Sequence, residues 1–285
     1  MKPATILPPH RVTIIGVLNL TPDSFSDGGR FVHGAAELDV EGAVEEAHRL
    51  VHAGADWLDV GGESTRPGAS PVAEADEIAR TRPAIEALVK DLDAVVSIDT
   101  RKAAVAEAAL DAGARVVNDV SGLAHDPDLA AVVARREAAL VLGHLRGQPA
   151  SMQQEVAFDD VLSEVTAELG ASIARALDAG VARERLVLDP GIGFGKELEH
   201  NLALLANVDV LKAEFDLPVM VGPSRKSFLG RLTGDPVEAR AVATHAACAV
   251  AIFSGADAVR VHEVADAVRV AAVARALRGA RRARR

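Results

Sequence analysis

Short apolar runs rich in Val, Ile and Leu alternate along the chain with longer segments in which Ala, Glu and Arg recur at helical spacing. Eight of the short runs predict β-strands, at 12–18, 57–60, 95–98, 115–117, 139–142, 186–188, 219–221 and 258–261. Each is followed by a segment that predicts a helix, at 39–53, 74–90, 102–111, from about 127, 158–179, 200–206, 237–253 and 264–277. Strands that alternate with helices are typical of a parallel sheet.

The number of these units predicts whether the sheet closes into a barrel or stays open. Eight strand–helix units in 285 residues, with no break in composition, favour a single-domain α/β fold over 1–285, the parallel (β/α)₈ TIM barrel. An open, doubly wound sheet of six or seven strands is the alternative. The basic residues 278–285 are expected to form a disordered tail beyond the last helix.

Composition adds limits on the class of protein. Apolar residues make up 49% and aromatic residues 3%, which predicts a large core of Ala, Val, Leu and Ile. The net charge of −10 argues against a nucleic-acid partner. No signal peptide or membrane span is evident, and the single Cys248 allows no disulfide within the chain, so a cytoplasmic protein is expected.

Polar or ionisable residues follow every predicted strand. In chain order the strand ends lead to Asn19, to Thr65 and Arg66, to Asp99, to Asn118, to His144, to Asp189, to Lys226, and to Arg260 and His262. Each residue alone could be a helix cap or a solvated side chain. Because barrel strands direct their carboxyl ends to one mouth, all eight together favour an active site there.

The charges at these strand ends suggest a ligand. Cations gather on three loops of an otherwise acidic chain, and they are Arg66, Arg225, Lys226, Arg260 and His262. Such a cluster favours a phosphorylated substrate. The middle strands instead end in Asp99, Asn118 and Asp189, whose carboxylates and amide suit a flat heterocycle rich in N–H donors.

The segment DPGIGFGK, residues 189–196, is glycine-rich but fits neither nucleotide-binding pattern. Only three residues separate Gly191 from Gly195, and Glu197 follows the lysine, so the P-loop spacing is not met. The segment predicts a tight turn that makes Phe194 a wall for a planar ligand.

Seven motifs together resemble the dihydropteroate synthase family. They are GVLNLTPDSFSDGG (16–29), DVGGESTRPGA (59–69), SIDT (97–100), NDVSG (118–122), LDPGIGFGK (188–196), VGPSRKSFLG (221–230) and VRVH (259–262). They cover nearly the whole chain, and the first two are similar to the two mobile loops of that family.

The resemblance implies a transferase that joins 6-hydroxymethyl-7,8-dihydropterin diphosphate to p-aminobenzoate and releases pyrophosphate. It implies that Asn19 contacts Mg²⁺, the expected metal cofactor, and that Asp99, Lys226, Arg260 and His262 are catalytic. The implied ligand contacts are Asp99, Asn118, Asp189 and Lys226 for the pterin, Thr65, Arg66, Arg260 and His262 for the diphosphate, and Phe25, Pro67, Phe194 and Ser227 for p-aminobenzoate. It also implies a homodimer, formed through the late helices.

Two positions depart from the family pattern. Gly143 stands where the family more often has Met, which predicts a missing side chain in the pterin floor, and Pro223 is expected to stiffen its loop. No insertion follows Pro67, so sulfonamides are expected to inhibit. Two alternatives are a methyltetrahydrofolate methyltransferase barrel and a non-catalytic pterin-binding protein, neither of which needs both GGESTRPG and SRKS.

Overall fold

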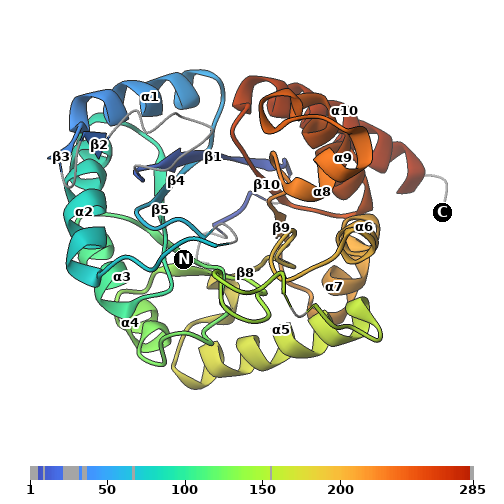
Figure 1. Ribbon diagram of the computed structural model, residues 1–285, viewed down its shortest axis with the longest axis horizontal. Helices are drawn as coiled ribbons and strands as arrows, with labels where there is room; N and C mark the ends of the chain where they lie inside the picture. Colours follow the sequence, from blue (N-terminus) through green and yellow to red (C-terminus); the bar gives the residue numbers. More distant parts are fainter. Residues whose placement is uncertain are drawn as a thin grey trace.

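A computed structural model of the chain describes residues 6–8, 10–21, 32–33, 37–65, 68–154 and 156–282. Eight parallel strands form its central sheet, surrounded by helices (Figure 1). The strands are β1 (Thr13–Asn19), β4 (Trp57–Gly61), β5 (Val95–Asp99), β6 (Val116–Asp119), β7 (Ala139–Leu142), β8 (Leu186–Leu188), β9 (Met220–Val221) and β10 (Ala258–Val261).

The sheet is a barrel. Its hydrogen-bonded order is β8-β7-β6-β5-β4-β1-β10-β9, and a parallel bridge between Leu188 and Val219 joins the two ends. The predicted parallel (β/α)₈ barrel is therefore confirmed. Three of the predicted strands, at 139–142, 186–188 and 258–261, have the predicted limits, and the others differ by one or two residues.

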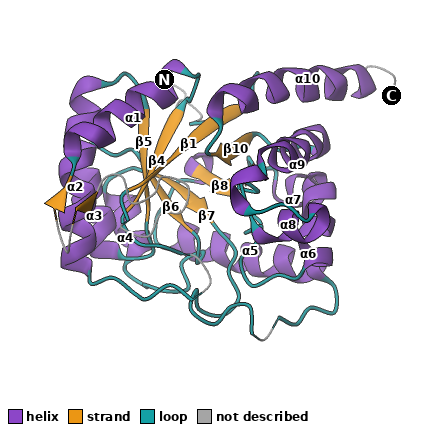
Figure 2. Ribbon diagram, turned by 45° about the horizontal axis from the view of Figure 1, so that its top comes forward, coloured by secondary structure: helices purple, strands orange, loops and turns teal. Residues whose placement is uncertain are grey.

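The helices between and after these strands form the outer ring (Figures 1 and 2). They are α1 (Val40–His52), α2 (Glu74–Asp91), α3 (Ala103–Asp111), α4 (Leu129–Arg135), α5 (Val161–Asp178), α6 (Leu198–Ala206), α7 (Val208–Phe215), α8 (Ser227–Thr233), α9 (Ala241–Ser254) and α10 (Val264–Arg282). Short 3₁₀ turns span Arg183–Arg185 and Val237–Ala239, and β2 (Val32–His33) pairs with β3 (Glu37–Leu38).

Side chains alternate between the barrel interior and the helix layer. In β4, Trp57 belongs to a small interior cluster with Ile15 and Ala258, whereas Leu58 and Val60 belong to the large core between strands and helices. Period-two alternation therefore directs Asp59 inward, one layer above Trp57. The same alternation directs the strand ends inward, so the barrel filling changes from apolar at the bottom to polar at the mouth.

The tail prediction is wrong for residues 278–282. Helix α10 continues to Arg282, and residues 283–285 lie outside the described part of the chain. Arg278 donates to the carbonyls of Ile252 and Ala256 at 3.4 and 3.5 Å, and Arg281 lies 5.2 Å from the Phe253 ring. These contacts at the end of α9 give the basic segment a packing surface, which composition alone does not reveal.

Candidate active site

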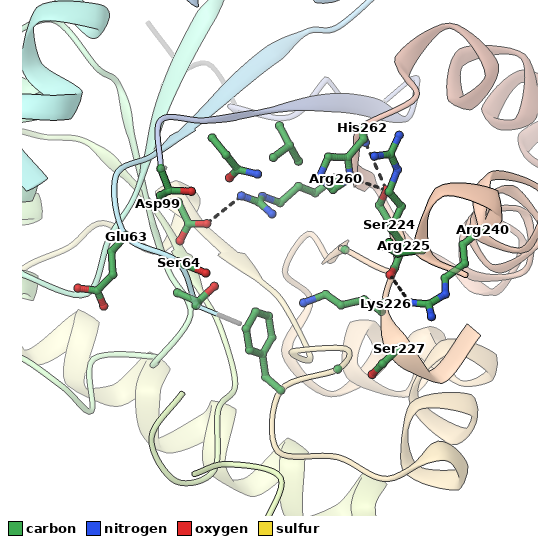
Figure 3. A pocket seen from close by; sticks show the side chains of 18 of the residues that line it. Glu63, Ser64, Asp99, Ser224, Arg225, Lys226, Ser227, Arg240, Arg260 and His262 are labelled. Atoms are coloured by element: carbon green, nitrogen blue, oxygen red, sulfur yellow. Dashed lines mark hydrogen bonds and ion pairs between the residues drawn. The ribbon is translucent and has the colours of Figure 1, made fainter. Parts of the chain in front are cut away.

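A cavity of about 520 Å³ lies at the carboxyl ends of the barrel strands (Figure 3). This size is ordinary for a small-molecule site. Eight of the predicted site residues line it: Asn19, Thr65, Asp99, Phe194, Lys226, Ser227, Arg260 and His262. They come from different strands and loops, so the barrel closure assembles them as predicted.

Arg260 joins two carboxylates at the inner end of the cavity. Its Nε donates to Asp59 at 2.5 Å, and its Nη2 donates to Asp99 at 2.8 Å. The side chain of Asp59 is 1% exposed, and that of Asp99 is 14% exposed. Since a buried charge is costly unless it is paired, this three-residue group accounts for an arginine inside an apolar strand.

The pKa values of Asp99 and Arg260 depart strongly from their ordinary values. Burial raises the pKa of Asp99 to about 7, although the Arg260 guanidinium opposes the shift and Asp59 adds to it. The flanking carboxylates Asp59 and Asp99 hold the pKa of Arg260 above its ordinary value despite its burial. The cavity therefore has a permanent cation beside a carboxyl that titrates near neutral pH.

Asn118 and Asp189 lie next to this group rather than among the residues that line the cavity. Asn118 donates its Nδ2 to Asp59 at 3.0 Å, and Asp189 accepts the Gly191 N–H at 2.8 Å. Burial raises the pKa of Asp189, while the nearby charge of Lys226 lowers it. Both polar side chains thus form a layer beneath the cavity.

The loop after β9 supplies the opposite wall. Ser224 Oγ lies 2.8 Å from His262 Nδ1, and Arg225 has a left-handed backbone with φ of 55°. Arg240 donates to the Arg225 carbonyl at 3.2 Å, so helix α9 supports this strained turn (Figure 3). Lys226 Nζ lies 3.6 Å from the centre of the Phe194 ring. Cations, a hydroxyl and an aromatic ring therefore face the carboxylate group across one cavity.

Comparisons with known proteins agree on one family. The family model described as "Pterin binding enzyme" matches residues 15–262. A dihydropteroate synthase of Synechocystis sp. is 44% identical over 248 residues, which cover 87% of this chain and 83% of that protein. The chain belongs to the dihydropteroate synthase family.

Solved dihydropteroate synthases have the same fold. The Yersinia pestis enzyme, described with a sulfonamide drug complex, matches with a TM-score of 0.89 and 39% identity over 96% of both chains. The Xanthomonas albilineans enzyme, described with 4-aminobenzoic acid, matches with a TM-score of 0.84 and 42% identity over 94% of this chain and 93% of that one. The chain is therefore a transferase of folate biosynthesis, as the sequence motifs predicted.

Three residues predicted from the dihydropteroate synthase motifs have no structural account. Phe25, Arg66 and Pro67 lie outside the described residues.

The fold brings to the dihydropteroate synthase site further residues that were not predicted from the sequence. Asp59 is the clearest, because a carboxylate within the apolar strand WLDVG needs a buried partner, as does the guanidinium of Arg260 within AVRV. Arg240 could not be predicted, because it reaches the cavity from the start of α9, far from any strand end.

The prediction for Gly143 is wrong. A Cβ at this position would lie 2.5 Å from the Val120 Cα and 2.8 Å from the Asp119 carbonyl oxygen. The backbone after β6 therefore occupies the space that a side chain would need. Gly143 allows a close approach of two strand ends and leaves no gap in the cavity floor.

The site suits a metal that arrives with its substrate. Among the described residues, no group of three or more His, Cys, Asp or Glu side chains could hold a metal ion. Asn19 lines the cavity and offers an amide oxygen. Because Mg²⁺ is commonly held by one or two protein ligands plus substrate phosphates and water, this donor set fits a magnesium diphosphate.

Proposed function

We propose that this chain condenses 6-hydroxymethyl-7,8-dihydropterin diphosphate with p-aminobenzoate to give 7,8-dihydropteroate and pyrophosphate. The observation that carries the proposal is the pairing of Arg260 with Asp99 in one cavity that also contains Lys226, His262 and Phe194. The cavity has a carboxylate floor that suits the pterin ring, a cationic rim that suits the diphosphate and an aromatic wall that suits p-aminobenzoate.

We assign the pterin ring to the inner end of the cavity. Asp99, Asn118 and Asp189 offer oxygen acceptors to ring N–H and amino groups, and Lys226 donates to a ring acceptor. Their burial supports this role, because a polar group in a dry site discriminates strongly between ligands that pair with it and ligands that do not.

The diphosphate is assigned to the cationic rim. Thr65, Arg66, Arg260 and His262 supply its donors, and Asn19 contacts the accompanying Mg²⁺. The metal, when bound, stabilises the charge of the leaving diphosphate. No helix of the described residues is long and apolar enough to cross a membrane. We place the enzyme in the cytoplasm as part of this proposal.

The amine substrate is assigned to the outer wall. Phe194 and Ser227 line the described part of this wall, and Phe25 and Pro67 complete it in our proposal. Ser227, the first residue of α8, is exposed, and in our proposal its hydroxyl donates to the carboxylate of the substrate.

In the reaction, the C–O bond to the diphosphate breaks before the amine attacks. The positive charge left on the pterin is stabilised by the Asp99 carboxylate, and Arg260 and His262 stabilise the departing anion. The amine nitrogen then forms the C–N bond, and its proton passes to the diphosphate, so the protein need not supply a general base.

A three-arm assay tests the proposal. The protein with Mg²⁺ receives pterin diphosphate with p-aminobenzoate, pterin diphosphate alone, or methyltetrahydrofolate with a corrinoid protein. We expect stoichiometric pyrophosphate release only in the first arm. Methyl transfer in the third arm would establish the methyltransferase alternative, and binding without turnover in every arm would establish the non-catalytic one.

Sulfonamides provide an independent test of the amine site. As analogues of p-aminobenzoate they are expected to inhibit competitively with that substrate and not with pterin diphosphate. A rate that stays constant up to high drug concentration would refute the assignment of the amine to this wall.

A further inference from the structure

A buried lysine lies directly beneath the aromatic wall of the cavity. Lys196 is 3% exposed, and its Nζ lies 3.0 Å from the Phe194 carbonyl, 3.3 Å from the His144 carbonyl and 2.8 Å from His144 Nδ1. An ammonium group has three protons and no acceptor. These three contacts use every donor of Lys196 and link the loop after β8 to the end of β7.

His144 continues this link toward the outer helix layer. Because its Nδ1 accepts from Lys196, its Nε2 is assigned the proton and donates to Glu168 at 2.8 Å. That bond lowers the pKa of Glu168 to about 2, and Arg146 also binds the same carboxylate. A permanent carboxylate on α5 therefore holds His144 in the tautomer that Lys196 requires.

The loop itself is folded closely onto the end of β7. Gly191 and Gly195 have positive φ, and a Cβ on Gly191 would lie 1.8 Å from the His144 carbonyl oxygen. A Cβ on Gly195 would lie 2.6 Å from the Arg146 carbonyl oxygen. A backbone made so permissive by glycine needs other contacts to keep one conformation.

Lys196 provides such a contact at Phe194, the residue of this loop that we place against the amine substrate. It holds the Phe194 carbonyl from below, while the Phe194 ring lines the cavity beside Lys226. All three donors of Lys196 are directed at the Phe194 and His144 acceptors, so we place its effect on a substrate at Phe194. Its burial is costly, and the hydrogen bonds to the two carbonyls and to His144 Nδ1 offset that cost.

We infer that Lys196, oriented by His144 and Glu168, is a positioning residue that sets the place of the Phe194 ring in the amine site. The inference rests on the proposed function for the identity of the ligand, which is an aromatic amine stacked against that ring. Loss of Lys196 would displace the wall and leave the Asp99 end of the cavity in place.

The first test replaces the ammonium by an apolar chain of similar length. In Lys196→Met we expect kcat/KM for p-aminobenzoate to fall by about 100-fold, as for a small displacement of a binding group. The KM for pterin diphosphate should change by less than about twofold, because uniform binding at the other end is retained. Lys90→Met, on the exposed face of α2, is the matched control and should change neither value.

A spectroscopic readout separates this inference from the proposed function. The chain is labelled with 4-fluorophenylalanine, and Phe194→Leu identifies the ¹⁹F resonance of residue 194. Without any substrate, that resonance should move and broaden in Lys196→Met, while the resonances of Phe215 and Phe253 stay unchanged. Phe158 is not a reference, because its ring lies 6.3 Å from that of His144. This result would support the positioning role even if the condensation assay failed.

A pair of variants at His144 covers the case in which Lys196→Met does not fold. His144→Asn keeps an acceptor for Lys196 and should retain most of the activity and the Phe194 resonance, whereas His144→Leu should lose both. Equal behaviour of the two variants would overturn the inference. So would a Lys196→Met protein that folds with an unmoved resonance, or one in which both KM values rise by the same factor.

Discussion

At the scale of single residues, one guanidinium holds the inner end of the site together. Arg260 pairs with two carboxylates, and Asp59 in turn accepts hydrogen bonds from Asn118 and Ser97. The arginine thus orders the residues proposed to hold the pterin, in addition to its own proposed contact with the diphosphate. Its loss should affect both stability and turnover.

Arg260→Met tests both effects. Leaving two buried carboxylates without their partner should lower the free energy of unfolding by about 3 kcal/mol. Loss of an electrostatic donor should lower kcat/KM by about 1,000-fold. Urea denaturation measures the first value and steady-state kinetics the second. Arg260→Lys keeps the charge but not the forked guanidinium, so both of its values should lie between those of the wild type and Arg260→Met. A kcat/KM within tenfold of wild type would contradict the role.

The carboxyl of Asp99 should impose a pH dependence. Its pKa is raised from 3.8 to about 7, so the folded protein binds more protons than the unfolded chain between these values. The contribution of Asp99 to stability is therefore present at low pH and falls as the pH rises through this window. Since the proposed reaction needs the carboxylate, kcat/KM should rise with pH through about 7.

The control for this pH profile is Asp99→Asn. The amide does not titrate, so the rising limb near pH 7 should vanish from its residual activity. Persistence of the same limb in this variant would assign it to another group.

Gly143 is the residue at which the sequence was misleading. Gly143→Ala should lower the free energy of unfolding by about 2 kcal/mol, because the added Cβ overlaps the backbone of Val120. Chemical denaturation measures this loss, with Gly279→Ala as the control, since nothing lies near that Cβ. An unchanged stability would restore the interpretation of position 143 as an unfilled gap.

At the scale of elements, the loop after β4 has a charged base. Glu63 accepts from Arg101 at 2.8 Å and also pairs with Lys102, and its carboxylate accepts the Val72 N–H at 3.2 Å. Lys102 pairs in addition with Glu77 of α2 at 2.6 Å. The two ends of the loop that carries Thr65 are thus joined through buried ion pairs.

Lys102→Met should destabilise the protein by about 3 kcal/mol, because two buried carboxylates lose one shared cation. Burial already raises the pKa of Glu77, so the variant should gain stability as the pH falls and this carboxyl takes up a proton. Urea denaturation at two pH values measures this, and Glu77→Gln in the same chain should restore part of the loss. Additive effects of the two substitutions would contradict the coupling.

Hydrophobic periodicity predicted the eight strands and most helices because each has one apolar face against a common core. It missed α7, whose residues 208–215 follow α6 without a glycine or proline to separate them. It also missed α8, because the seven residues Ser227–Thr233 are too few to give a clear helical repeat. At the site, strand-end positions were predictable, whereas Arg240 and the Lys196 link depend on contacts between distant elements.

At the scale of the whole molecule, we propose a homodimer through the late helices. Helix α9 exposes Val242 at 81% and Val250 at 50%. Val250→Glu combined with Val242→Glu should halve the mass measured by analytical ultracentrifugation, because charges are unfavourable in an apolar interface. Val89→Glu, on α2 across the barrel, is the control and should leave the mass unchanged (Figure 1). A wild-type chain that sediments as a monomer would contradict the proposal.

The central claim is that one cavity at the barrel mouth joins the pterin to the amine. The most direct measurement is mass spectrometry of the products formed from pterin diphosphate and p-aminobenzoate with Mg²⁺, compared with pyrophosphate release in the same sample. We predict 7,8-dihydropteroate and pyrophosphate in equal amounts from the wild-type protein, and formation of both about 1,000-fold slower with Arg260→Met. Pyrophosphate without dihydropteroate, or equal product from both proteins, would contradict the account.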